Sequence, residues 1–162
     1  MIKLVIRPAG EMDARKIAAL MNEIIKAGGT TAITTELAAQ DILGLMQEGQ
    51  RAAWHVAEDE ACTLYGLQWF EEHPDLPKDV ANIATFTRVG KTGLGIGSQL
   101  FEATLKAAKG LGYQWINANI RADNEGGLIY YQSRGFENHS RQEGVKLADG
   151  SIVDKVIKRY RL

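Results

Sequence analysis

Three glycines at alternate positions constrain the fold of this chain more than any other feature of its sequence. Gly93, Gly95 and Gly97 follow a β-rich run that ends at Thr87-Arg88-Val89, and an amphipathic helical pattern begins directly after them. Glycine adopts backbone conformations that other residues avoid, so such a loop can curl until several N–H groups point into one concavity. The positive end of the following helix dipole adds to the positive potential there. The pattern predicts a cradle for a pyrophosphate group.

Two familiar phosphate-binding loops do not fit this segment. A dinucleotide fingerprint needs a third glycine, where this chain has Ser98, and a carboxylate in the next strand, which residues 113–120 lack. A nucleotide-triphosphate loop needs a first glycine before Gly90-Lys91-Thr92, at the position where this chain has Thr85. A purely structural role, in which the glycines let a helix pack closely on a strand, stays open at this point.

A second segment, farther along the chain, has a recognisable order. After a predicted helix from Gly97 to Gly110 and a strand around Trp115 comes Asn124-Glu125-Gly126-Gly127-Leu128-Ile129-Tyr130-Tyr131-Gln132-Ser133-Arg134-Gly135-Phe136. This order resembles the Gcn5-related N-acetyltransferase (GNAT) family, in which an acyl-CoA loop, Arg/Gln-x-x-Gly-x-Gly/Ala, precedes a helix, a strand, an Asn-led helix and Tyr-x-x-x-Gly-Phe. The residues on the family positions are Gly95, Gly97, Asn124, Tyr131, Gly135 and Phe136.

The resemblance extends to the amino terminus. Ile6-Arg7-Pro8-Ala9, followed by an amphipathic helical pattern, is similar to the opening of GNAT proteins. Residues 30–36, Thr-Thr-Ala-Ile-Thr-Thr-Glu, resemble a segment of the phosphinothricin and amino-acid N-acetyltransferase subgroup. The resemblance implies an α/β, single-domain GNAT fold over residues 1–162, with a mixed, mostly antiparallel sheet of about seven strands flanked by about four helices.

The hydrophobic pattern agrees with that fold. It predicts the order β-α-α-β-β-β-α-β-α-β-β, with Gly28-Gly29 ending the first helix and Thr35 capping the second. The predicted strands are 2–7, 54–58, 62–70, 80–88, 113–120 and 152–160, the last of which forms a hairpin around the turn 148–150, and the first helix is 12–26.

Composition narrows the function. The chain has 162 residues, 45% of them hydrophobic, and a formal net charge of −1, which gives general nucleic-acid binding little electrostatic basis. The single cysteine, Cys62, excludes an internal disulfide framework and suits a reducing compartment. No signal segment and no apolar run long enough for a membrane span occurs, so we expect a cytoplasmic protein without a membrane partner. No Cys or carboxylate lies at metal-ligand spacing from His55 or His139, so we expect no metal.

The resemblance implies acetyl-CoA as co-substrate. In the family, the end of the fourth strand pairs with pantetheine amides, and the amides at the start of the next helix meet the pyrophosphate. Asn124 matches a CoA-contacting asparagine and is also an ordinary helix cap. The residues expected to bind the co-substrate are Phe86, Thr87, Val89, Thr92, Gly93, Leu94, Gly95, Ile96, Gly97, Ser98, Asn124 and Tyr131.

The same resemblance gives Tyr131 the role of general acid, which protonates the departing thiolate. The spacing of four residues before Gly135 selects Tyr131 and not its neighbour Tyr130, which points about 100° away on a helix and is expected to pack. A structural or CoA-contacting role of Tyr131 is the alternative.

Two positions depart from the family pattern. Thr92 stands where the loop has Arg or Gln, so a side-chain contact to phosphate is shortened or lost, and Lys91 or Lys106 would have to compensate. Asn82 stands where the amino-acid subgroup has a glutamate that acts on the amine, and an amide does not accept a proton at neutral pH. Deprotonation then falls to a water chain or to one of three residues expected on the preceding loop, which are Glu71, Glu72 and His73.

We therefore expect an N-acetyltransferase that acts on the primary amine of a small molecule, an amino acid or analogue, by direct attack in a ternary complex. A backbone N–H near Thr87 or Val89 would stabilise the oxyanion. The residues expected around the acceptor are Thr31, Ile33, Glu36, Glu72 and His73. The alternatives are a peptide or protein N-terminal acetyltransferase, a polyamine acetyltransferase, and a non-catalytic CoA-binding sensor. The resemblance to the family implies a homodimer whose subunits meet through the C-terminal strands.

Overall fold

The predicted order of elements runs through the whole chain. The computed structural model describes residues 2–91 and 94–162. The elements are β1 (Val5–Pro8), a short 3-10 helix (Glu11–Asp13), α1 (Ala14–Ala27), α2 (Ala39–Glu48), β2 (Ala53–Glu58), β3 (Leu64–Glu71), β4 (Val80–Thr87), α3 (Ile96–Gly110), β5 (Trp115–Arg121), α4 (Glu125–Ser133), β6 (Glu137–Lys146) and β7 (Ile152–Arg161).

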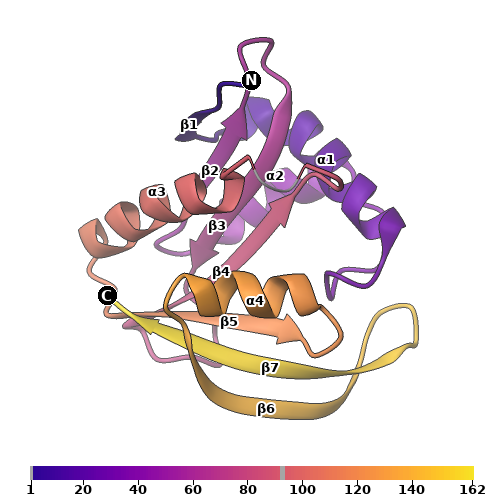
Figure 1. Cartoon of the computed structure of the whole chain (residues 1–162), viewed down its shortest axis with the longest axis vertical. Coiled ribbons are helices and arrows are strands. Elements are labelled where there is room, and N and C mark those ends of the chain that lie inside the picture. The colour runs from indigo at the N-terminus through magenta and orange to yellow at the C-terminus, as the bar shows by residue number, and fades with distance from the viewer. Residues whose placement is uncertain (1, 92–93) are drawn as a thin grey trace.

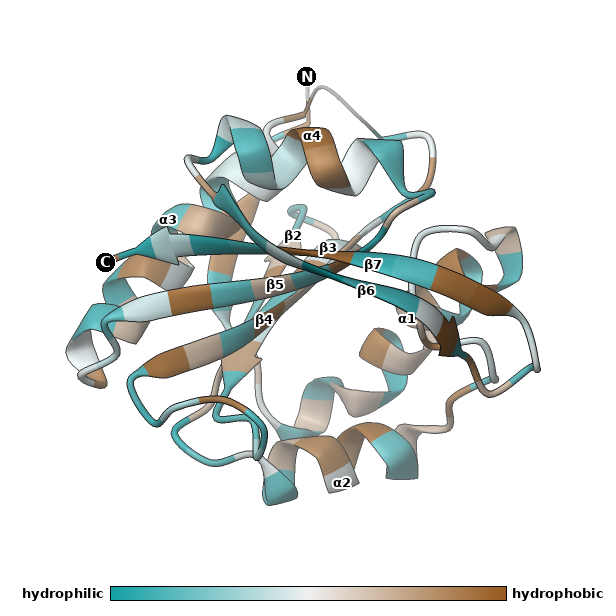
Figure 2. Ribbon diagram, turned by 90° about the horizontal axis from the view of Figure 1, so that it is seen from below, coloured by the Kyte–Doolittle hydropathy of each residue, from teal (hydrophilic) through white to brown (hydrophobic). Residues whose placement is uncertain are grey.

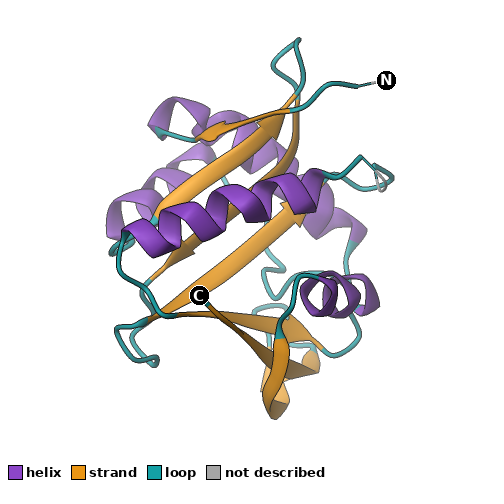
Figure 3. Ribbon diagram, turned by 60° about the vertical axis from the view of Figure 1, so that its left-hand side comes forward, coloured by secondary structure: helices purple, strands orange, loops and turns teal. Residues whose placement is uncertain are grey.

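Within the described residues, the strands form one seven-stranded sheet in the order β1-β2-β3-β4-β5-β7-β6. Neighbouring strands are antiparallel except β4 and β5, which run parallel. The expected fold class, a mixed and mostly antiparallel sheet flanked by four α-helices, is confirmed. Figure 3 shows how β4 diverges from the strands that follow it.

The helices cover both faces of the sheet (Figure 1). Helices α1 and α2 pack Ile17, Met21 and Ile42 against Val56 and Leu67, all of which are fully buried. Helices α3 and α4 cover the other face, where a second core forms around Phe70, Phe101, Ile116, Tyr131 and Phe136. In Figure 2, α4 lies on one side of β5, β6 and β7, and α1 and α2 lie on the other.

Several expected element boundaries are wrong, among them the start of the first strand, which is Val5 and not residue 2. The second helix begins at Ala39 and not after Thr35, because Asp41 accepts a hydrogen bond from the Ala38 backbone N–H (2.7 Å) and caps the helix from within its own first turn. Thr35 lies exposed in the preceding loop. The third strand begins at Leu64 and extends to Glu71, so Glu71 belongs to the sheet and not to a loop.

In the described part of the chain, no helix is long and apolar enough to cross a membrane.

Candidate active site at the fork between β4 and β5

The ladder between β4 and β5 ends before either strand does. The two strands pair from Val80–Trp115 to Ile83–Ala118, whereas β4 continues to Thr87 and β5 to Arg121. Beyond Ile83, the β4 backbone groups that would face β5 have no ladder partner there, so they can pair with an extended ligand. Phe86 turns its side chain into the core beside Trp69 (ring centroids 5.7 Å apart), so this side chain is not available to a ligand. This divergence is the fork.

The glycine loop leads to the open end of the fork. Gly95, the N-cap of α3, has a φ of +70°, a left-handed conformation that favours glycine. Ile96 is buried and can offer only its backbone, whereas Ser98 presents its hydroxyl in the first turn of α3. Leu94 packs beside this region, and Val89 is exposed. The expected residues Thr92 and Gly93 lie outside the described residues.

Arg134 is a cation at this helix start that sequence reasoning missed. Its Nη1 donates to Ser98 Oγ (2.7 Å), and its buried Nε has no partner. No carboxylate among the described residues forms an ion pair with it, and Thr92 and Gly93 have no acidic side chain. A half-buried guanidinium without a carboxylate, beside the positive end of a helix, fits an anionic ligand. Arg134 stands directly before Gly135, in the segment 124–136 that resembles GNAT proteins, and this position was the signal by which the sequence could have revealed it.

The two adjacent tyrosines of α4 occupy different environments. Tyr131 is buried on the α3/α4 face, and its hydroxyl lies 2.8 Å from Thr85 Oγ1 of β4. Burial raises the pKa of this phenol above its ordinary value. Tyr130 donates to the Gly97 carbonyl (2.8 Å) and accepts from Gln68 Nε2 (3.1 Å). Burial raises the pKa of Tyr130 to about 12, so both phenols keep their protons at neutral pH.

Asn124 ties two distant segments together at the mouth of the fork. Its Oδ1 accepts from the Gly127 backbone N–H (3.0 Å), which confirms the predicted cap of α4. Its Nδ2 donates to the Thr30 carbonyl (3.1 Å), and Arg121, the last residue of β5, donates to the Thr31 carbonyl (3.0 Å). The segment that resembles the amino-acid subgroup therefore lies where β5 ends and α4 begins.

The other expected acceptor residues of that segment have different surroundings. Ile33 packs on the core of the α1/α2 face, and its backbone N–H donates to Thr31 Oγ1 (3.1 Å). Glu36 is exposed, and no hydrogen bond or ion pair of its side chain is formed within the described residues.

A polar row crosses the α1/α2 face just below the fork. Asn82 Oδ1 accepts from Asn117 Nδ2 (3.2 Å), and Asn117 Oδ1 accepts from Arg159 Nε (3.0 Å). Asn82 and Asn117 are register partners one rung before the ladder ends, and Asn117 is only 1% exposed. Asn82, in the position of the subgroup's glutamate, is thus held by the amide of Asn117, which is in turn held by the Arg159 guanidinium.

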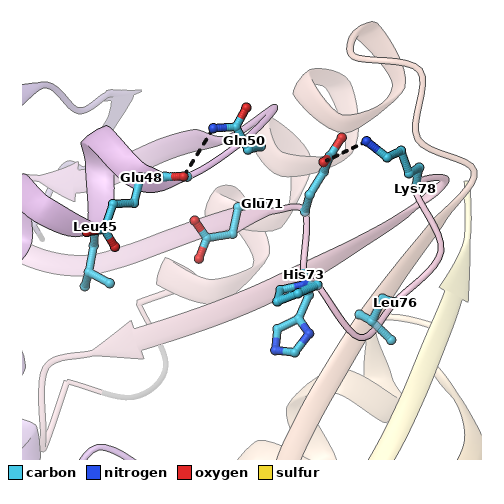
Figure 4. A pocket seen from close by; sticks show the side chains of 10 residues that line it. Leu45, Glu48, Gln50, Glu71, His73, Leu76 and Lys78 are labelled. Carbon is cyan, nitrogen blue, oxygen red and sulfur yellow. Dashed lines mark hydrogen bonds and ion pairs between the residues drawn. The ribbon is translucent and has the colours of Figure 1, made fainter.

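Glu71 stands directly across from Asn82 on β3. Its side chain lines a cavity of about 420 Å³ together with Leu45, Glu48, Gly49, Glu72, His73 and Lys78. Figure 4 shows the carboxylate of Glu71 between Glu48 and His73. A side chain at Gly49, the C-cap of α2, would collide with Glu71 Oε2. Burial raises the pKa of Glu71, and the negative end of α2 acts in the same direction.

The two neighbours of Glu71 are less available as bases. Glu72 forms an ion pair with Arg51 (3.1 Å) and lies 4.0 Å from Lys78. His73 accepts a hydrogen bond on Nδ1 from the Asp75 backbone N–H (3.1 Å). Among the titratable groups expected here, Glu71 has no ion pair within the described residues and has a raised pKa.

Arg7 and Arg88 both form ion pairs with carboxylates. Arg7 pairs with Asp13 and Glu58, each at 2.7 Å, and Arg88 pairs with Glu23 at 2.7 Å. No group of three or more His, Cys, Asp or Glu side chains suited to a metal ion occurs within residues 2–91 and 94–162.

Comparisons with known proteins agree with this geometry. No protein-family model matches the chain. The Bacillus subtilis (strain 168) protein named "Putative phosphinothricin acetyltransferase YwnH" is 25% identical over 160 residues, which cover 96% of this chain and 98% of that protein. A crystal structure provisionally described as a phosphinothricin N-acetyltransferase has a TM-score of 0.85 at 25% identity and covers 99% of both chains.

A third similarity concerns the fold alone. The GNAT-superfamily phosphinothricin acetyltransferase from Sinorhizobium meliloti, solved in complex with AcCoA, has a TM-score of 0.85 at 18% identity, covering 98% of this chain and 88% of that one. The order of the motifs, the fork between β4 and β5 and the likeness over nearly the whole length lead to one conclusion: the chain is similar to phosphinothricin N-acetyltransferases along nearly its whole length, and it is an acyltransferase.

Proposed function

We propose that the protein transfers the acetyl group of acetyl-CoA to the primary amine of a small amino acid or amino-acid analogue, by direct attack in a ternary complex. The observation that carries the proposal is the fork, which has a buried tyrosine on one face of the sheet and a half-buried carboxylate on the other. One group can supply a proton and the other can remove one: Tyr131 contacts Thr85 of β4, and Glu71 lies opposite Asn82 of the same strand.

The described residues fit acetyl-CoA, which supplies the acetyl thioester. The backbone of Thr87, on the side of β4 that faces the fork, would pair with the extended pantetheine arm, with Val89 just beyond it. The amides at Gly95–Ser98 would bind the pyrophosphate at the positive end of α3. Arg134, with its unpartnered Nε, would supply the cation that the family has at the position of Thr92.

Glu71 is the proposed base. As the amine nitrogen bonds to the acetyl carbon, its proton passes to the Glu71 carboxylate, directly or through one water. The raised pKa makes Glu71 a stronger base than an exposed glutamate. Its place opposite Asn82 puts the carboxylate one strand away from the family position, on the same face of the sheet. Asn82, in turn, keeps the strands joined through Asn117.

Tyr131 is the proposed acid. As the carbon–sulfur bond breaks, the phenol donates its proton to the leaving sulfur, so that CoA leaves as a neutral thiol. Burial, which keeps the phenol protonated until that moment, supports this role. Backbone N–H groups near Thr87 and Val89 would stabilise the negative charge that develops on the carbonyl oxygen.

The positive charge of Arg159 on the α1/α2 face of the sheet supports an amine acceptor that also has an anionic group. Arg159 lies on the α1/α2 face and donates a hydrogen bond to Asn117, and it forms no ion pair within the described residues. A carboxylate or phosphinate attached near the amine would pair with this guanidinium. The names of the relatives, which mention phosphinothricin, point to the same chemical class.

The test is acetyl-CoA-dependent thiol release across amino acids, amino-acid analogues, polyamines and short peptides. Saturable turnover with amino acids or analogues, and its absence with their decarboxylated counterparts, would support the proposal. Preference for peptides or polyamines would replace the acceptor class. CoA binding without turnover of any amine would favour a non-catalytic sensor. Sedimentation of the same sample tests whether the protein is a homodimer, and localisation of the tagged protein tests whether it is cytoplasmic.

A further inference from the structure

A connected set of buried hydrogen bonds surrounds Gln68 in the middle of β3. The side chains of Gln68 and Thr104 are 0% exposed, although both are polar. Gln68 Oε1 accepts from Thr104 Oγ1 of α3 (2.5 Å), while its Nε2 donates to Thr85 Oγ1 of β4 (2.9 Å) and to the Tyr130 hydroxyl of α4 (3.1 Å). Thr85 in turn contacts the Tyr131 hydroxyl at 2.8 Å. One amide thus links two helices and two strands.

The backbone of α3 fixes the direction of these hydrogen bonds. Tyr130 has one proton and donates it to the Gly97 carbonyl, which can only accept (2.8 Å). Towards Gln68, the Tyr130 oxygen is therefore an acceptor, and the atom of Gln68 that faces it must be the amide nitrogen. The amide oxygen must then face Thr104, whose hydroxyl donates to it. The network therefore fixes the orientation of the Gln68 amide.

The same logic reaches Tyr131. Thr85 accepts a hydrogen bond from Gln68, and the remaining partner of its hydroxyl within the described residues is Tyr131. If Thr85 donates to Tyr131, the protons of Gln68, Thr104, Tyr130 and Thr85 each have an acceptor, and the proton of Tyr131 points away from Thr85. Tyr130, by contrast, has its proton committed to Gly97. The network therefore distinguishes two adjacent phenols of the same chemical type.

We propose that Gln68 and Thr85 are positioning residues that keep the phenol proton of Tyr131 free for the leaving group, an inference that rests on the proposed role of Tyr131. When the carbon–sulfur bond breaks, the proton moves from the Tyr131 oxygen to sulfur and leaves a phenolate. That phenolate accepts the Thr85 hydroxyl, whose oxygen is held by the Gln68 amide. A hydrogen bond to the charged form stabilises it, so the network acts at the step where charge develops.

The test compares Thr85→Val with Thr85→Ser, which keeps the hydroxyl. Loss of a hydrogen bond to a charged group corresponds to about a 10- to 100-fold decrease in kcat. We expect that decrease for Thr85→Val, a kcat near wild type for Thr85→Ser, and a KM for acetyl-CoA within about twofold for both, since the Thr85 hydroxyl contacts Gln68 and Tyr131 and not the glycine loop. Gln68→Met, which removes the amide at similar volume, should follow Thr85→Val. Thr63→Val, in the β2–β3 turn, is the matched control, and thermal melting verifies that each variant is folded.

A second measurement separates positioning from general structural damage. A selenoester analogue of acetyl-CoA has a more acidic leaving group, which needs less assistance from an acid. The deficit of Thr85→Val should therefore shrink with the selenoester, as should that of Tyr131→Phe, and Thr85→Val should change kcat by less than about twofold in a Tyr131→Phe background.

Each of the other outcomes refutes a specific part of the proposal. An equal deficit with both donors, or full activity of Thr85→Val and Gln68→Met beside an impaired Tyr131→Phe, refutes the positioning role alone. A fully active Tyr131→Phe refutes the acid role and this inference with it. A wild-type protein without turnover of any amine refutes the proposed function as a whole.

Discussion

Replacing Gly97 by alanine tests the closest packing contact at the site. Gly97 lies in the first turn of α3, and the ring of Tyr130 lies directly against it. A Cβ at this position would be 2.5 Å from Tyr130 Cε1 and 3.1 Å from Cζ. The ring cannot easily retreat, because its hydroxyl is hydrogen-bonded both to the Gly97 carbonyl and to Gln68. Either α3 or α4 must shift.

The expected cost can be worked out from these contacts. Overpacking a well-packed site costs about 1–3 kcal/mol, and each of the two Tyr130 hydrogen bonds, if broken, costs about 1 kcal/mol. Alanine returns about 0.5–1 kcal/mol through its better helix propensity. The net loss of stability for Gly97→Ala is about 2–4 kcal/mol, which for a chain of this size lowers Tm by about 4–16 °C.

The assay is thermal unfolding followed by circular dichroism, with Gly44→Ala as the matched control. Gly44 lies inside α2, and nothing lies within 4 Å of the position that its Cβ would take. This control should raise stability by up to about 1 kcal/mol, because alanine favours the helix. The two substitutions are thus expected to have opposite signs. A Gly97→Ala protein with a Tm equal to or above that of the wild type would refute the close packing of α4 on α3.

Three further predictions concern single side chains. Glu71→Gln should lower kcat by about 100-fold or more and remove the acidic limb of the pH–rate profile, whereas Glu48→Gln, in the same cavity, should not. Burial raises the pKa of Glu71 in the folded state, so the protonated carboxyl favours folding below the unfolded pKa, and this contribution is lost as pH rises through the folded pKa. The Glu71→Gln side chain stays neutral at every pH, so this variant should melt at a higher temperature than the wild type at neutral pH. Arg134→Leu should raise KM for acetyl-CoA about 10-fold or more, with Arg134→Lys between, and an unchanged KM would remove Arg134 from the phosphate site. Arg159→Gln should raise KM for an amino-acid acceptor about 10-fold while KM for acetyl-CoA stays constant; equal effects on both would contradict its proposed role.

Much of the fold was predictable because its signals are local. The glycine loop, the cap at Asn124 and the alternation along the strands each depend on a few neighbouring residues, and their order matched a known family. The prediction that Thr35 caps the second helix was wrong because it, too, depended on a local signal. Thr35 is a good capping residue before the helix, but Asp41 inside the helix does the capping. Glu71 was predicted on a loop but lies on β3, because the strand continues one residue past Phe70, the last apolar residue of its run.

The site was predictable only along the recognised motifs. Tyr131 and Asn124 could be placed, but Gln68, Arg134 and Arg159 could not, since their roles depend on partners that the fold brings together from distant parts of the sequence. Gln68 left one signal, a single amide inside the apolar run of β3. Such a residue predicts a buried polar group with satisfied hydrogen bonds, but it does not predict which ones.

The alternation of side chains along the sheet has a consequence for the catalytic cycle. Glu71 faces α2, whereas Tyr131 belongs to the core beneath α3 and α4. With the proposed roles, each turnover takes up a proton on one side of the sheet and gives one away on the other. The protein that releases its products is therefore not yet the protein that bound its substrates, because one side holds an extra proton and the other lacks one. Two separate exchanges with solvent must restore it, and each can be slowed without touching the other.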